Sequence, residues 1–185
     1  MKRILLIVGI LIVGFQYCYG IDSLRTKTDF ACIASKNLES NLQDIIATPK
    51  KYVSDINDDK CVLNLLDSIS KYAIVKKDTN YLRALNAICK SSDGYVSDAI
   101  MEICRTHFYE NFNAFVNYCY ARKSCLRGKT IEGLSMEISV SENKKLAEHR
   151  LDKFINDHLR RMRLEKDKVD FVKKIRKEVD PKMFD

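Results

Sequence analysis

Apolar residues recur at intervals of three and four along most of the chain, which is the period of one face of an α-helix. The pattern predicts helices over 29–47, 57–77 and 79–89, with Pro49 ending the first. Asn57, Asp58 and Asp59 supply a cap and first-turn acids for the second helix. The side chains expected to face the core are Ala34, Leu38, Leu42, Ile45, Val62, Leu65, Leu66, Ile69, Ala73, Leu82, Leu85, Ile88 and Cys89.

The same period predicts a fourth helix over 97–122, which is the most aromatic part of the sequence. Phe108, Phe112 and Phe115 lie on one of its faces. An aromatic stripe of this kind is typical of core packing, and the alternative is an apolar pocket beside the three rings.

Residues 134–140 depart from the helical period, because apolar and polar side chains alternate strictly there. Strict alternation is typical of a strand, but an isolated strand has no partner to pair with. We therefore expect an extended segment lying on the helices, with a small hairpin or a dimer strand as the alternative.

The final segment, 141–185, carries 14 lysines and arginines and 10 aspartates and glutamates. Two short apolar stripes predict one long amphipathic helix over 141–179, bent near Glu165, about 55 Å long if straight and projecting in part. Three interpretations stay open: a charged surface packed on the domain, a self-associating or partner-binding helix resembling a coiled-coil seam, and a basic helix on an anionic membrane or polyanion. The candidate contact residues are Arg160, Arg161, Arg163, Lys166 and Lys168.

The N-terminus has the three parts of a secretory signal peptide. Lys2 and Arg3 precede an apolar run from Ile4 to Phe15, which is shorter than the roughly 20 residues that cross a bilayer. Small residues at Cys18 and Gly20 predict cleavage after Gly20, with an uncleaved anchor as the alternative. The predicted location is therefore extracellular.

Cleavage would remove Cys18 and leave an even number of cysteines in an oxidising compartment, which predicts three disulfides. Six cysteines allow fifteen pairings, and spacing does not choose among them. On a continuous fourth helix Cys104 and Cys119 would lie about 22 Å apart, too far to pair with each other. The predicted disulfide cysteines are Cys32, Cys61, Cys89, Cys104, Cys119 and Cys125.

Only three glycines and two prolines remain after residue 20, so the fold class predicted is all-α. We expect a disulfide-stapled bundle of about four helices over 21–140, followed by the charged helix over 141–185.

Candidate chemistry is sparse. Cys104 and His107 share a helix face in the pattern of a nucleophile and a base, but an oxidising compartment favours a disulfide at Cys104. No metal, cofactor or phosphate-binding motif occurs, and nothing indicates nucleic-acid binding. The sequence therefore predicts a secreted, non-enzymatic protein that acts by contact with an unidentified extracellular protein. The alternative is a carrier that holds a small apolar ligand among the rings of the fourth helix.

Overall fold

The computed structural model describes residues 38–54, 59–161 and 165–184. This part of the chain is helical and contains no strand, which confirms the predicted all-α class. Its helices are α2 (Leu38–Ala47), α3 (Pro49–Ser54), α4 (Asp59–Lys76), α5 (Thr79–Cys89), α6 (Gly94–Glu110), α7 (Phe112–Tyr120), α8 (Cys125–Ser139), α9 (Lys144–Arg161) and α10 (Lys166–Glu178).

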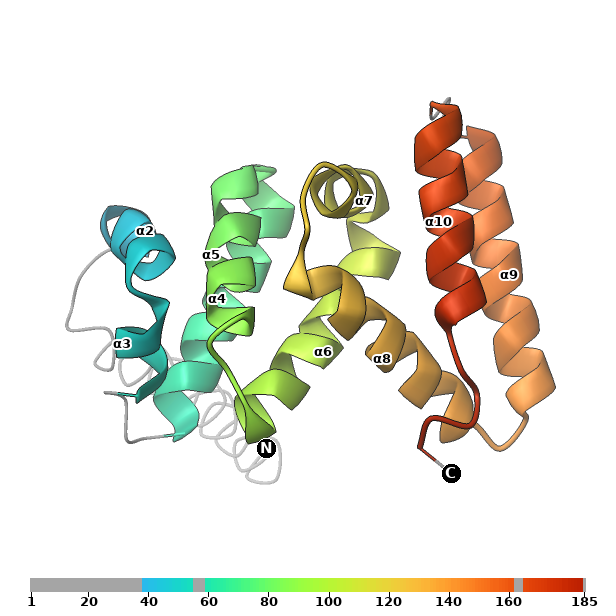
Figure 1. Ribbon diagram of the computed structural model, residues 1–185, viewed down its shortest axis with the longest axis horizontal. Coiled ribbons are helices and arrows are strands. Elements are labelled where there is room, and N and C mark those ends of the chain that lie inside the picture. The colour runs from blue at the N-terminus through green and yellow to red at the C-terminus, as the bar shows by residue number, and fades with distance from the viewer. Residues whose placement is uncertain (1–37, 55–58, 162–164, 185) are drawn as a thin grey trace, which may run out of the picture.

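The described helices follow one another along the long axis of the molecule, with α2 and α3 at one end and α9 and α10 at the other (Figure 1). The central helices α4 to α8 lie between them and share one apolar core with both ends. We call α2 to α8 the body and α9 with α10 the C-terminal hairpin.

The predicted helices over 29–47, 57–77 and 79–89 are confirmed where the structure describes them, which for the first helix is 38–47. Their expected core residues from Leu38 onward are buried. α5 begins where Asp78 caps it, since the Asp78 carboxylate accepts a hydrogen bond of 2.8 Å from the backbone N–H of Asn80.

The predicted continuous helix over 97–122 is wrong. Asn111, with φ −127° and ψ 35°, interrupts it and separates α6 from α7. The Asn111 side chain makes no capping hydrogen bond and its buried Nδ2 has no partner, so side-chain capping does not explain the break. The two helices change direction at Asn111, as Figure 1 shows.

The predicted extended segment over 134–140 is also wrong, because residues 134–139 form the last part of α8 and Val140 is its C-cap. Leu134, Ser135 and Ile138 are buried, whereas Met136 and Val140 are exposed. The buried Ser135 hydroxyl donates to the Ile131 carbonyl at 2.7 Å, so a polar residue can occupy a core position. The alternation of residue types therefore did not reflect an alternation of burial.

Gly133 lets α8 approach α6 closely. A Cβ atom at this position would lie 2.9 Å from the Met101 carbonyl oxygen and 3.1 Å from the Arg105 Cβ. The small residue therefore sets the separation of these two helices, which form the most extensive helix pair in the body.

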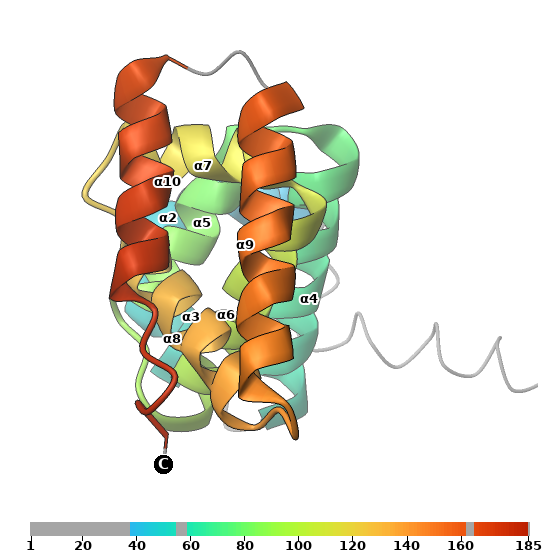
Figure 2. The ribbon, with the colours of Figure 1, turned by 90° about the vertical axis from the view of Figure 1, so that its right-hand side faces the viewer.

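The charged tail forms two helices rather than one. α9 and α10 run side by side in opposite directions (Figure 2), and the interruption falls near Glu165, where a bend was predicted. Leu151 and Ile155 of α9 and Val172 and Ile175 of α10 are buried. The hairpin therefore packs on α7 and α8, and a straight helix of about 55 Å does not form.

Several predictions fall on residues outside the described part of the chain. These are the signal peptide, the start of the first helix with Ala34, the cap residues Asn57 and Asp58, Cys32 and Arg163. None of the described helices has the length and apolar character needed to span a membrane.

Candidate functional site

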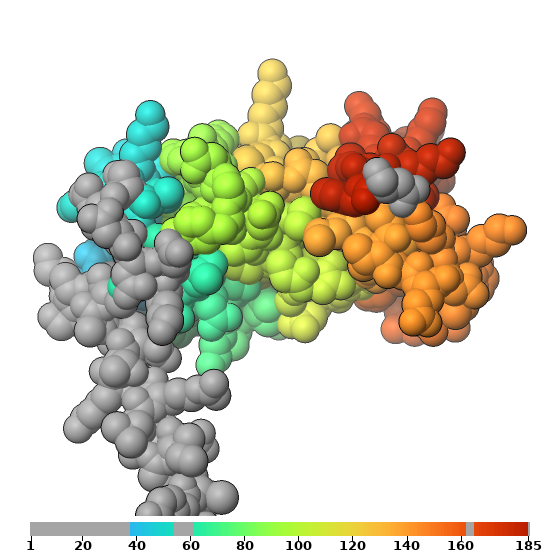
Figure 3. All heavy atoms as spheres, turned by 90° about the horizontal axis from the view of Figure 1, so that it is seen from below, coloured from blue at the N-terminus to red at the C-terminus, as the bar shows by residue number. Residues whose placement is uncertain are grey.

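The basic residues predicted as a contact surface gather at one end of the C-terminal hairpin. Arg160 and Arg161 end α9, and Lys166 and Lys168 lie in the first turn of α10. We call these four residues the hairpin tip. In Figure 1 this end of α9 and α10 extends beyond α7, so the tip stands clear of the body. Figure 3 shows from below that the hairpin forms one end of the molecule.

The tip is open to solvent and mostly free of neutralising partners. Arg160, Arg161 and Lys166 are exposed and form no ion pair with another described residue. Lys168 lies 3.6 Å from the Glu165 carboxylate. Positive charge therefore remains available for contact with an acidic surface.

The apolar stripes of the hairpin, in contrast, are used inside the molecule. Phe154 contacts the rings of Phe108, Phe112 and Tyr109, with centroids 5.9, 5.7 and 4.8 Å away. Along the outer side, the Arg176 guanidinium donates to both oxygens of Asp152, at 2.6 and 3.3 Å. Self-association through a coiled-coil seam would need these same apolar side chains, which already pack against the body.

Phe108, Phe112 and Phe115 lie in the core and do not line any of the described hollows. Phe108 and Phe112 pack edge to face at 5.1 Å, and Phe115 stacks on His107 at 5.6 Å. The three rings therefore fill space between α6, α7 and α9, which is the core-packing interpretation of the aromatic stripe.

His107 is fully buried in the same core. Its Nε2 lies 3.1 Å from the Ser70 hydroxyl, while its Nδ1 has no hydrogen-bond partner. Burial lowers the pKa of His107 to about 4, so the ring is neutral at physiological pH. Without solvent access, His107 cannot act on a substrate as the base of the predicted Cys104–His107 pattern.

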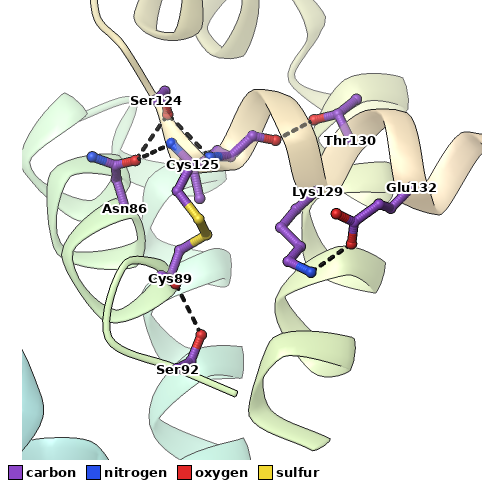
Figure 4. Close-up of a disulfide and its surroundings, with 9 residues drawn as sticks. Asn86, Cys89, Ser92, Ser124, Cys125, Lys129, Thr130 and Glu132 are labelled. Atoms are coloured by element: carbon purple, nitrogen blue, oxygen red, sulfur yellow. Dashed lines mark hydrogen bonds and ion pairs between the residues drawn. A yellow bond between two sulfur atoms is a disulfide. The ribbon is translucent and has the colours of Figure 1, made fainter. Parts of the chain in front are cut away.

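One predicted disulfide staple is observed. Cys89, at the end of α5, is bonded to Cys125, at the start of α8, with Cα atoms 6.0 Å apart (Figure 4). The Asn86 side-chain oxygen accepts from the Ser124 hydroxyl and from the Cys125 N–H, each at 2.9 Å. These contacts fix the entry to α8. Cys61 is also disulfide-bonded.

Cys104 and Cys119 are free thiols, so the prediction of three disulfides is wrong for this pair. Both are buried, where a thiol packs as a small apolar side chain. The expected separation of about 22 Å between Cys104 and Cys119 assumed one continuous helix. The break at Asn111 removes that assumption. Burial raises the pKa of Cys104, and the nearby Cys119 thiol raises it further. Burial likewise raises the pKa of Cys119, to about 12.

The surface beside the Cys89–Cys125 disulfide is hollowed and positively charged, which no sequence motif predicts. Lys90, Arg122, Lys123 and Arg127 are among the residues lining a hollow of about 760 Å³, which we call the basic hollow. The signal available in the sequence is the run of arginines and lysines around Cys125. Only the pairing with Cys89 brings Lys90 beside them.

No group of histidine, cysteine, aspartate and glutamate side chains suited to hold a metal ion occurs among the described residues. Comparisons of the chain with protein-family models, with curated proteins and with solved structures find no match.

Proposed function

We propose that the protein is secreted and acts without catalysis, through contact between the hairpin tip and an acidic surface of an extracellular protein. The observation that carries this proposal is the exposed, unneutralised positive charge at an end of the molecule that stands clear of the body.

The way the hairpin is built supports this role. Its apolar side chains pack on α6, α7 and α8, so the hairpin is docked on the body while most of its charged side chains face solvent. A rigid element loses little conformational entropy when it binds, which favours recognition by a preformed surface.

The described residues give less support to an enzyme or an apolar carrier. His107 is enclosed by the core, whereas the acids of α6 and of the residue before it are exposed: Asp93, Asp98, Glu102 and Glu110. The aromatic rings proposed for a ligand pocket pack on one another. Neither function has an observation in its favour.

The contact is tested by site-specific photo-crosslinking on the extracellular proteins of the source tissue. A photoreactive side chain placed at Glu165, beside the tip, should give a protein adduct of discrete mass. The same side chain at Lys174, an exposed position further along α10, should not. Equal adducts from both positions would contradict a contact centred on the tip.

Charge reversal then tests the chemistry of the contact. Arg160→Glu with Arg161→Glu should abolish the adduct at Glu165, whereas Lys173→Glu with Lys174→Glu changes the net charge equally and should leave it. Truncation at Ser141 is not a clean test, because it would uncover the core residues that Phe154 covers.

Secretion is tested independently by expressing the full chain in a eukaryotic secretory host. The medium should contain a protein whose first residue is Ile21. Retention in the cell with Met1 intact would overturn the proposed location.

A further inference from the structure

The basic hollow continues into a second hollow, and the two together form an elongated positive surface. The adjoining hollow, of about 510 Å³, shares Lys90 and Arg122 with the basic hollow and adds Arg83. No aspartate or glutamate is among the residues that line either one. Five positive side chains therefore face one continuous depression.

Most of this charge is not neutralised within the described part of the chain. Arg127 pairs with Glu178 at 2.7 Å, and Arg83 donates to the side-chain oxygen of Asn80 at 3.1 Å. Lys90, Arg122 and Lys123 are exposed and make no ion pair with a described carboxylate. Repulsion among these cations is a cost that an anionic ligand would relieve.

Helix stability does not explain all of the cluster. Lys90 and Arg122 follow the C-termini of α5 and α7, where positive charge interacts favourably with the helix dipole. Lys123 and Arg127 lie at the N-terminus of α8, where positive charge is unfavourable. Two cations are therefore placed against the local electrostatic preference.

The frame of the depression is rigid. The Cys89–Cys125 disulfide and the Asn86 hydrogen bonds hold α5 and the start of α8 together, as Figure 4 shows. The cations thus project as long side chains from a fixed backbone. Such an arrangement suits several separate anionic groups better than one enclosed anion, because the described donors do not converge on a buried point.

We propose that this surface binds a sulfated polysaccharide chain. Sulfate groups repeat along such a polymer and stay ionised at all physiological pH values, and guanidinium groups bind sulfate-like oxyanions through paired hydrogen bonds. The choice of a sulfated polysaccharide rests on the proposed secretion. It does not depend on the proposed contact at the hairpin tip.

The aromatic residues of the depression favour a polysaccharide over a single-stranded nucleic acid. Arg127 lies over the Phe171 ring and Arg122 over the Tyr118 ring, at 5.8 and 5.1 Å from the centroids. Tyr120 packs edge to face with Phe171 at 5.7 Å. Guanidinium groups lie over Phe171 and Tyr118, which leaves Tyr120 as the exposed ring, whereas nucleic-acid surfaces offer several free ring faces for base stacking.

The experiment measures binding of the full secreted chain to heparin by titration calorimetry at several salt concentrations. Lys90→Gln, Arg122→Gln and Lys123→Gln combined should weaken binding about 10-fold or more at 0.15 M salt and make it less dependent on salt. The matched control, Lys173→Gln, Lys174→Gln and Lys177→Gln combined, removes the same charge from exposed α10 positions outside the depression and should change affinity less than 3-fold.

Titrations with three other ligands distinguish a sulfated polysaccharide from other anionic ligands. Desulfated heparin, single-stranded DNA of equal charge and phosphatidylserine vesicles should each bind more weakly than heparin. Equal losses in the two triple variants, unchanged binding in the first, or tighter binding of DNA or vesicles would each overturn the proposal.

The protein contact at the hairpin tip and the polysaccharide site in the depression can be disproved independently. The tip variant Arg160→Glu with Arg161→Glu should keep at least a third of the heparin affinity while it loses the protein adduct. Loss of heparin binding only in that variant would overturn the assignment of the site to the depression.

Discussion

Two helices of similar length show how differently the body and the C-terminal hairpin are built. α5 has 11 residues, of which seven are buried, and one charged side chain, Arg83. α10 has 13 residues, of which two are buried, and more than half of its side chains are charged. The body is therefore held by its core and a disulfide, whereas the hairpin is held by a narrow apolar stripe and surface ion pairs.

The difference separates stability from function. Residues that hold the body together are buried and unavailable for contact, as the Cys89–Cys125 disulfide and the stacked His107 and Phe115 rings show. The hairpin adds fewer buried residues to the core than the body does, and most of its charged side chains are exposed. We therefore expect substitutions of buried residues of the body to change unfolding, and substitutions of exposed charges, on the hairpin or in the basic hollow, to change binding.

The largest effect on stability is expected from removing the Cys89–Cys125 disulfide of the body. Cys89→Ala with Cys125→Ala should lower the free energy of unfolding by about 4 kcal/mol, because the bond closes a loop with a sequence separation of 36 residues. Urea unfolding followed by circular dichroism measures the loss. A change below about 1 kcal/mol would mean that the core alone holds the body.

The next effect concerns pH and the buried His107. Its pKa is about 4 in the folded protein against about 6.5 when unfolded, so between these values only the unfolded chain takes up the proton. This histidine should lower the free energy of unfolding by about 3 kcal/mol as the pH falls from 7 to 4.

His107→Gln should remove that part of the pH dependence, which urea unfolding at a series of pH values can measure. The same slope in the variant and the wild type would assign the acid sensitivity to other groups and would make the body no more sensitive than the hairpin.

A smaller effect is expected where α6 and α8 meet. Gly133→Ala should destabilise the protein by about 1 to 3 kcal/mol, since the added methyl group meets backbone and side-chain atoms of α6. Gly128→Ala, in the same helix with open space around it, should stabilise by roughly 0.5 to 1 kcal/mol. Thermal unfolding of the two variants compares them, and a stable Gly133→Ala protein would refute tight packing at this crossing.

The smallest effect is expected at the ion pair of the hairpin. In a double-mutant cycle, Arg176→Gln and Asp152→Asn should show a coupling of about 0.5 to 1 kcal/mol, because the pair is bidentate but partly exposed. The coupling should shrink in 1 M salt. A coupling as large as the disulfide effect would remove the contrast between the two regions.

The body shows which parts of the fold follow from the sequence. α5 was predicted over its observed range because a regular apolar stripe and the turn that follows it agree, and the structure adds the Asp78 cap. The break at Asn111 was missed, because the apolar period continues across it and the change of direction depends on packing between helices. Ser135 was misinterpreted for a related reason, since its burial depends on hydrogen bonds that only the folded chain provides.

The sites depend even more on the tertiary structure. The hairpin tip could be predicted in part, because its residues are close together in the sequence and charge at a helix end is readable there. The basic hollow could not, because Lys90 reaches Arg122 and Lys123 only through the Cys89–Cys125 pairing. Cysteine spacing alone does not determine that pairing.

Native-state hydrogen exchange tests the contrast between body and hairpin most directly. Amides of α9 and α10 should exchange through a partial opening whose free energy is clearly below that of global unfolding, while amides of α5 and α6 should exchange only when the whole chain unfolds. Equal protection of α5 and α10 would contradict the account, because the hairpin would then belong to the same cooperative unit as the body.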